Sequence, residues 1–480
     1  MNSKDLDLPK KEFKELLDIS TEMILQKFEH FEERKAFHSF PQTEIENWFD
    51  EKPPSEGMSQ VELLEEVKHK ILDTATDNIG VHMYGYVMAG GTQISIIAEK
   101  LAATINQNIG KWHLAPSIVE IEKRVVQWSS EIIDFGKDIG GVLVSGGSEA
   151  NLAGLTVARN IFFEKKNIQQ KGLFGLKPFT VYASTEVHGC IDKSVTQLGI
   201  GTNNLRKIAV NSDFTIDIEI LEQTIKEDIE KGFEPFCVIG TAGTVNTGAI
   251  DDLNSISALA QKYGLWFHVD GAYGGLACVL PSVKKYYMGL KKADSVAIDF
   301  HKWLYQTFEV GCVLVKNWDT LRNAYFKKAD YLDSNLEDQN RLNFNEHTFQ
   351  LSRNAKALKV WMSIKGYGMN KLKKMIQKDI DLAGYLSDQV NEAPDFELQA
   401  RSALAVSCFR YVGNLSDESE IESFNKKLVA ALEKDGRVFL TGTKLNGIFV
   451  LRACVINHRK QKKDIDYLLR IIRDVAKTLH

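Results

Sequence analysis

The sequence has no long apolar run, and its charges nearly balance. No uninterrupted apolar stretch approaches about 18 residues, so no transmembrane helix is expected. The 59 basic and 64 acidic side chains give a net charge of −5, and no long basic stripe is present. We therefore expect neither a membrane nor nucleic acid as a partner.

Paired cysteines are also absent. The six cysteines are scattered and form no CxxC motif, which disfavours a disulfide framework or a metal site and favours a reducing compartment. The first residues, MNSKDLDLPKKEFKELL, are charged and include no apolar segment typical of a signal peptide. A cytoplasmic location is the expectation that follows.

The glycine fingerprints GxGxxG and GxxxxGK[ST] are missing, which disfavours a nicotinamide oxidoreductase and a P-loop enzyme. Short apolar runs instead alternate with helix-length segments, and this pattern predicts a mostly parallel α/β sheet. Ligands of such sheets bind at the carboxyl ends of the strands. The predicted strands are GGVLV from residue 140, 180–184, 205–210, 235–244, 265–271, 295–299 and 311–315.

Changes of periodicity divide the chain into three predicted parts. Residues 1–90 form a helical segment, residues 91–365 a large α/β domain, and residues 366–480 a small α+β domain. The helical segment carries an apolar stripe that needs a surface to pack on. Either a partner subunit or the core of the same protomer could supply that surface.

Five polar side chains follow predicted strands and are therefore candidates for one site: Ser148, His188, Thr244, Asp270 and Lys302. Lys302 lies in DFHKW, directly after an apolar run. Apolar surroundings disfavour a charged amine, and an uncharged amine can attack a carbonyl. Taken alone, this stretch favours an ordinary lysine whose stem packs at a strand end, and the other candidates reverse that preference.

The candidates supply the four functions that pyridoxal 5′-phosphate requires. Lys302 can hold an aldehyde, and Asp270 can keep a pyridine nitrogen protonated so that the ring accepts electrons. His188 can stack on the ring or carry a proton. The glycine-rich turn at Ser148 opens a helix, whose free N–H groups favour a phosphate. No metal site is indicated.

Six motifs resemble the fold-type I, group II amino-acid decarboxylases, whose members act on aromatic amino acids, glutamate or cysteine sulfinate. They are SGGSEANLAGLTVAR, STEVHG, GTAGTVNTGAIDDL, WFHVDGAYGG, DFHKW and LSRNAKALKVW. The resemblance spans roughly residues 75–480 and implies a homodimer with shared active sites. It also implies a large domain with a mostly parallel sheet and pyridoxal phosphate as the cofactor.

The resemblance assigns roles to individual residues. Lys302 matches the lysine that binds the cofactor, Asp270 the partner of its ring nitrogen, and His188 the histidine on one face of the ring. Tyr331 matches a loop tyrosine that reaches the neighbouring subunit and protonates the product carbon, a role that His188 could also fill. The matched cofactor-binding residues are Gly147, Ser148, His188, Thr244, Asp270, Ala272, Asp299, His301 and Lys302.

The expected substrate is an aromatic L-amino acid, with contacts from His82, Tyr84, Trp112 and Arg353. Three departures from the family pattern are His82 and Met83 at pocket positions, Val245 where many relatives have threonine, and Asp299-Phe300 where many have Asn-Pro. A decarboxylase of glutamate, aspartate or cysteine sulfinate is therefore an alternative. A further alternative is a protein that binds the cofactor but is catalytically silent.

Overall fold

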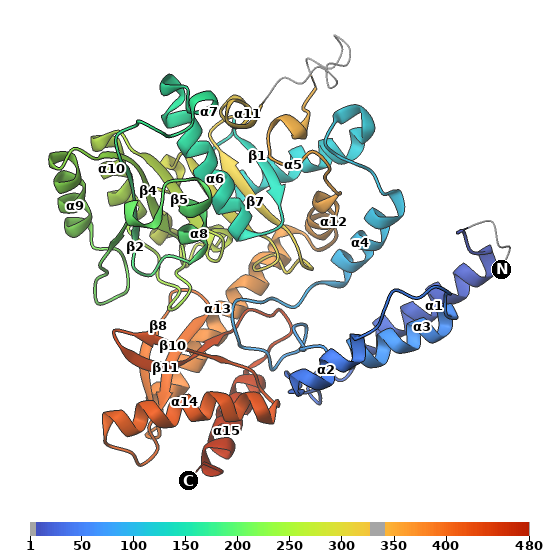
Figure 1. Cartoon of the computed structure of the whole chain (residues 1–480). Helices are drawn as coiled ribbons and strands as arrows, with labels where there is room; N and C mark the ends of the chain where they lie inside the picture. The colour runs from blue at the N-terminus through green and yellow to red at the C-terminus, as the bar shows by residue number, and fades with distance from the viewer. Residues whose placement is uncertain (1–5, 327–340, 480) are drawn as a thin grey trace.

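The computed structural model describes residues 6–326 and 341–479 of the chain. Figure 1 shows a large α/β body, a smaller C-terminal part beside it, and an N-terminal arm of helices that projects away from both. Tyr331 lies outside the described residues.

The large body is built on a seven-stranded sheet with the order β1-β7-β6-β5-β4-β2-β3. β7 runs antiparallel to β1 and β6, whereas the other neighbours are parallel. The predicted mostly parallel sheet is therefore confirmed. Its strands are β1 Gly140–Val144, β2 Phe179–Ser184, β3 Leu205–Ile208, β4 Glu234–Thr241, β5 Trp266–Gly271, β6 Ser295–Asp299 and β7 Gly311–Val315.

Helices cover both faces of this sheet, which explains why its strands read as continuous apolar runs. On β5, Phe267 and Val269 point to the face where α10 packs, whereas His268 and Asp270 point to the face covered by α6. The helices of this region are α4 Gln93–Ile105, α5 Pro116–Ile132, α6 Gly147–Phe162, α7 Ile168–Lys171, α8 Cys190–Gln197, α9 Ile218–Glu230, α10 Leu253–Tyr263, α11 Trp318–Tyr325 and α12 Lys356–Tyr367.

The N-terminal arm consists of α1 Lys10–Gln26, α2 Gln42–Phe49 and α3 Gln60–Val67, continued by a π-helical turn at Lys68–Leu72. α1 and α3 lie side by side (Figure 1). Many apolar side chains of the arm remain exposed, among them Phe13, Leu25 and Leu63. Within residues 6–326 and 341–479, no helix is both long and apolar enough to cross a membrane.

The C-terminal part contains an antiparallel sheet with the order β10-β11-β9-β8, packed against α13 and α14. On α15, Ile465, Leu468, Leu469 and Ile472 recur at helical spacing and are all buried. This α+β arrangement was predicted from the sequence. Its elements are α13 Met369–Glu392, β8 Phe396–Arg401, β9 Val406–Tyr411, α14 Glu418–Asp435, β10 Thr441–Leu445, β11 Ile448–Cys454 and α15 Lys462–Lys477.

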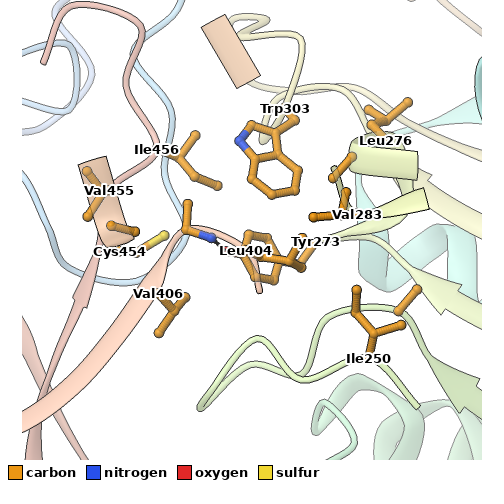
Figure 2. Close-up of a cluster of buried hydrophobic side chains, with 14 of the residues drawn as sticks. Ile250, Tyr273, Leu276, Val283, Trp303, Leu404, Val406, Cys454, Val455 and Ile456 are labelled. Atoms are coloured by element: carbon orange, nitrogen blue, oxygen red, sulfur yellow. Dashed lines mark hydrogen bonds between the residues drawn. The ribbon is translucent and has the colours of Figure 1, made fainter. Parts of the chain in front are cut away.

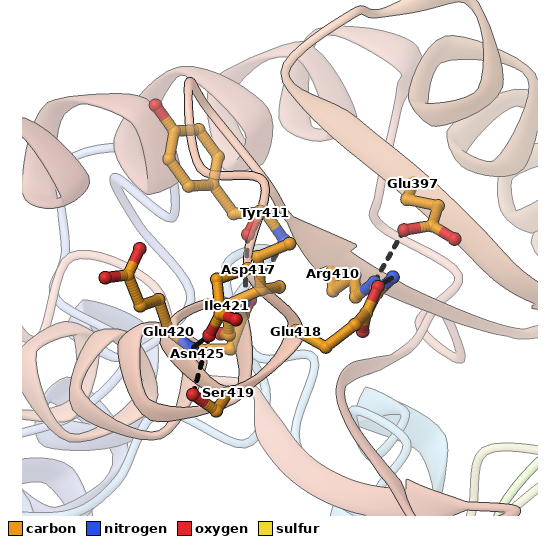
Figure 3. Close-up of polar contacts among 9 residues, drawn as sticks. All are labelled: Glu397, Arg410, Tyr411, Asp417, Glu418, Ser419, Glu420, Ile421 and Asn425. Carbon is orange, nitrogen blue, oxygen red and sulfur yellow. Dashed lines mark hydrogen bonds and ion pairs between the residues drawn. The ribbon is translucent and has the colours of Figure 1, made fainter.

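A polar cluster joins β8, β9 and α14 on this C-terminal part (Figure 3). Arg410 donates to Glu397 and Glu418, each at 2.6 Å. The Asn425 side chain accepts from the Tyr411 amide and donates to the Tyr411 carbonyl. These bonds attach the edge of the small sheet to the helix beside it.

Candidate active site

A cavity of about 350 Å³ opens at the carboxyl ends of β4, β5 and β6, beside the first turn of α6. This is where a mostly parallel sheet is expected to bind its ligand. Eight residues predicted for the site line it together: Gly147, Ser148, His188, Asp270, Ala272, Asp299, His301 and Lys302.

The register of the sheet places two polar side chains at the floor of the cavity. Thr241 on β4 pairs with Asp270 on β5, so both side chains leave the same face of the sheet. Asp270 is 5% exposed and accepts a hydrogen bond from the Ala272 amide at 3.2 Å. The buried Thr241 hydroxyl has no hydrogen-bond partner among the described residues. Both groups can therefore bond a ligand that enters the cavity.

Asp299 is tied to the backbone at the opposite wall. Its two oxygens accept from the Gly147 amide at 3.0 Å and from the His301 amide at 3.1 Å. The His301 ring nitrogen Nδ1 lies 2.9 Å from the carboxylate. Asp299 thus fixes the start of α6 against the chain that precedes Lys302.

The first turn of α6 leaves room for an anion. Helix N-termini have N–H groups without intrahelical acceptors, and the helix dipole favours negative charge there. A Cβ atom added at Gly147 would meet the Ala272 Cβ at 2.6 Å, so glycine is required for this close approach. Ser148, which follows Gly147, also lines the cavity. This turn fits the phosphate of the expected cofactor.

His188 follows β2 and stands in the cavity wall. The Cys190 amide donates to its Nδ1 at 3.1 Å, which leaves Nε2 to carry the proton of the neutral ring. Burial lowers the pKa of His188; the Asp270 charge opposes this shift, and Lys302 adds to it. The ring is therefore neutral at neutral pH.

A hydrogen-bonded chain below the cavity was missed by the sequence analysis. His268 Nδ1 lies 2.8 Å from the Ser295 hydroxyl, and its Nε2 lies 2.8 Å from the Asn151 side-chain oxygen. Asn151 in turn donates to the Gly147 carbonyl at 3.0 Å. Burial lowers the pKa of His268 to about 4, so the ring stays neutral beside Asp270. The sequence signal for this chain was the spacing His268-x-Asp270, which places both side chains on the same face of one strand.

Thr244 is not a cavity residue in the structure. Its hydroxyl lies 3.0 Å from the Thr247 hydroxyl and accepts from the Ala249 amide at 3.1 Å. Thr241 and Val245 line the cavity instead. The register of β4 places the Thr241 side chain, rather than that of Thr244, at the cavity. The sequence GTAGTV does not show this register.

Arg353 and Trp112 also lie outside the cavity lining. Arg353 is buried behind β1, where it donates to Glu122 at 2.5 Å and to the Leu143 carbonyl at 2.7 Å. The Trp112 indole donates to Glu120 at 3.0 Å. Within the described residues of the protomer, neither side chain lines the cavity that contains Lys302.

His82 and Tyr84 belong to the contact between the arm and the C-terminal part. His82 stacks on Tyr467 with ring centres 4.4 Å apart. Tyr84 is fully buried, and its hydroxyl donates to the Asp464 carbonyl at 2.8 Å. The segment from Val81 is a buried turn with one β-bridge, Met83 to Phe439.

Comparison with known proteins identifies the family. The family described as "Pyridoxal-dependent decarboxylase conserved domain" matches residues 41–412. The chain is 30% identical over 476 residues to an aromatic-L-amino-acid decarboxylase of Bacillus atrophaeus, covering 99% of this chain and 97% of that protein. The chain belongs to the pyridoxal-dependent decarboxylases. Its cofactor is pyridoxal 5′-phosphate, and it is a carboxy-lyase.

Solved structures share the whole fold of this decarboxylase. The crystal structure of Oryza sativa TDC with PLP and tryptamine superposes with a TM-score of 0.93 at 22% identity, covering 99% of this chain and 100% of that one. A glutamate decarboxylase domain from Vibrio parahaemolyticus gives a TM-score of 0.87 at 26% identity, with 99% and 97% coverage. The backbone alone therefore does not select a substrate.

Proposed function

We propose that this decarboxylase converts an aromatic L-amino acid to its amine and CO₂. The observation that carries the proposal is the charge of the cavity. Its described lining contains the carboxylates of Glu149, Asp270, Asp299 and Glu309, and no arginine. The described lining therefore offers no arginine to pair with a second carboxylate on the substrate, whereas an uncharged ring needs no such partner.

The similarity to the aromatic-L-amino-acid decarboxylase of Bacillus atrophaeus supports the same substrate class. Phe308, which lines the cavity and packs on His301 with ring centres 4.4 Å apart, offers an apolar surface. Within the described lining, Lys302 is the only lysine or arginine that a second carboxylate could pair with, and it is assigned to the cofactor. The aromatic class is therefore favoured.

The proposed roles follow from the position of each side chain. Lys302 binds the cofactor, Asp270 keeps its ring nitrogen protonated, and His188 and Ala272 enclose the ring. The Ser148 end of the Gly147–Ser148 turn binds the phosphate, and Asp299, which accepts from the Gly147 amide, holds that turn in place. The Thr241 hydroxyl provides a further hydrogen bond at the cavity floor.

The cofactor supplies an electron sink for the pair of electrons left when the bond between Cα and the carboxylate breaks. Enclosure by His188 and Ala272 keeps water away from that carbon. A proton must then be delivered to Cα to give the amine, and His188 in its protonated, imidazolium form is one donor that the chain provides. Tyr331 is the other proposed donor.

We also propose a homodimer. Ile97, Leu101 and Ile105 form an exposed apolar stripe at helical spacing on α4, in addition to the exposed apolar side chains of the arm. A second copy of the chain would bury these surfaces and bring Tyr331 to the neighbouring cavity. Sedimentation of the wild type and of Leu101→Glu tests this; a fully active wild-type monomer would contradict it.

The deciding experiment measures CO₂ release from a panel of L-amino acids by the protein reconstituted with pyridoxal phosphate. Release from tryptophan, tyrosine or phenylalanine, and not from glutamate, aspartate or cysteine sulfinate, is expected. The opposite selectivity would establish the acidic alternative. A bound cofactor without CO₂ from any amino acid would show that the protein is catalytically silent.

A further inference from the structure

The three residues that follow Lys302 are buried in a left-handed turn. Trp303, Leu304 and Tyr305 are each no more than 1% exposed. Leu304 has φ 88° and Tyr305 has φ 54°, a region that side chains other than glycine rarely adopt. Such a conformation persists only where surrounding contacts impose it. The contacts that hold this turn therefore also determine where Lys302 points.

Those contacts come from the C-terminal part of the chain. The Tyr305 hydroxyl donates to the Asp379 carboxylate on α13 at 2.8 Å, and the Tyr305 ring meets His458 edge-on with centres 5.0 Å apart. Trp303 stacks on Tyr273 and shares a buried cluster with Ile456 (Figure 2). The small domain thus holds the chain immediately after the cofactor-binding lysine.

Hydrogen bonds within the turn connect Tyr305 to the short segment that contains Lys302. The Gln306 amide donates to the Phe300 carbonyl at 3.1 Å, which closes a ring of residues around Lys302. The Gln306 side chain donates to the Leu304 carbonyl at 2.6 Å and accepts from the Ser363 hydroxyl at 3.1 Å. These bonds connect both ends of the turn that contains Lys302 and Tyr305.

We propose that Tyr305 and Asp379 are positioning residues, which hold the strained turn so that the Lys302 amine is aimed at the cofactor. This inference rests on the proposed role of Lys302. It assigns part of the site geometry to α13, outside the cavity lining.

The chemistry of the pair fits a buried anchor. Burial raises the pKa of Tyr305 well above its ordinary value, so the hydroxyl remains a donor. Asp379 is fully buried and presents a carboxyl oxygen to that hydroxyl. Burial raises the pKa of Asp379 to about 7, and the Tyr305 hydrogen bond and the Lys460 charge oppose this shift. A hydrogen bond to a buried carboxylate is lost only at the cost of leaving that group without a donor.

The chain offers a matched control in a second buried tyrosine–aspartate pair. The Tyr182 hydroxyl on β2 donates to Asp228 on α9 at 2.7 Å. Neither residue lines the cavity. Replacing either tyrosine by phenylalanine removes one buried hydroxyl that donates to an aspartate and retains the ring, although Asp228 keeps its pairing with Arg206.

The test compares Tyr305→Phe and Tyr182→Phe in the holoenzyme. We expect Tyr305→Phe to lower kcat about tenfold with KM changed less than about twofold, since small misplacements of a reacting group reduce rate more than binding. We also expect a changed pH midpoint of the bound-cofactor absorbance near about 420 nm. Tyr182→Phe should change neither. A wild-type kcat and absorbance titration in Tyr305→Phe would overturn the proposal.

Two Asp379 variants separate positioning from stability. Asp379→Asn keeps an acceptor for the Tyr305 hydroxyl and should retain kcat within about twofold. Tyr305→Phe/Asp379→Leu removes the stranded carboxyl, so its unfolding temperature should recover while kcat stays low. Recovery of kcat together with stability would reduce the pair to a structural role and overturn the proposal. If wild-type protein shows no cofactor band, the proposed function itself fails.

Discussion

The cavity and the Arg410 cluster both gather carboxylates, but they stabilise them differently. Arg410 lies 2.6 Å from both Glu397 and Glu418, and these glutamates are open to solvent (Figure 3). In the cavity, Asp270 and Asp299 are nearly inaccessible and accept hydrogen bonds from backbone amides. No arginine lines the described cavity.

This difference separates charges that stabilise the fold from charges that remain available to a ligand. An arginine partner would satisfy a carboxylate and remove it from further chemistry. Backbone donors fix the orientation of Asp270 and Asp299 without neutralising them. Buried carboxylates without a positively charged partner reduce the stability of the fold, a cost that proteins accept at functional sites. Substitutions in the two regions should therefore have opposite consequences for activity and stability.

The largest effect is expected for Lys302→Ala. Loss of the amine that binds the cofactor should lower kcat by at least about 10³-fold, because a covalent catalytic group is removed. The cofactor absorbance band should disappear, and the unfolding temperature should not fall. Lys444→Ala, in the C-terminal sheet, is the control and should leave the band unchanged. Retention of the band in Lys302→Ala would contradict the assignment of this lysine.

Arg353→Met should reduce stability rather than substrate binding. Glu122 would remain fully buried without its cation, which costs about 3–5 kcal/mol in the free energy of unfolding. Urea unfolding measures this loss, and adding Glu122→Leu should recover part of it. A raised KM at unchanged stability would instead support a contact between Arg353 and the substrate carboxylate.

Asp270→Asn should affect activity and spare stability. An amide cannot keep the ring nitrogen of the cofactor protonated, so kcat should fall about 10²–10³-fold. The unfolding temperature should stay equal or rise, because a buried charge is removed. Glu397→Gln is the matched change in the Arg410 cluster and should leave kcat unchanged. Equal activity of Asp270→Asn and wild type would exclude the proposed role.

Arg410→Met should have the smallest effect. Its partners are exposed and can be solvated by water, so the free energy of unfolding should fall by about 1 kcal/mol. Activity should not change. A loss of activity comparable to that of Asp270→Asn would remove the distinction between the two regions.

Most of the cavity could be anticipated because its residues follow strands in the sequence. Gly147, His188, Asp270 and Lys302 each lie at the end of a predicted strand, and a parallel sheet collects such ends along one edge. Thr244 was chosen over Thr241 because a sequence shows neither strand register nor which hydroxyl already has a partner. The assigned catalytic and binding roles remain predictions.

The amino-acid sequence alone determined the alternation of strands and helices, the mostly parallel sheet and the family, because these depend on local periodicity and on motifs of contiguous residues. Tertiary structure decided that Arg353 pairs with Glu122 and that Tyr305 is anchored on Asp379. Both contacts join residues more than 70 positions apart. Such pairs depend on how finished elements pack, and neither periodicity nor spacing along the chain encodes that packing directly.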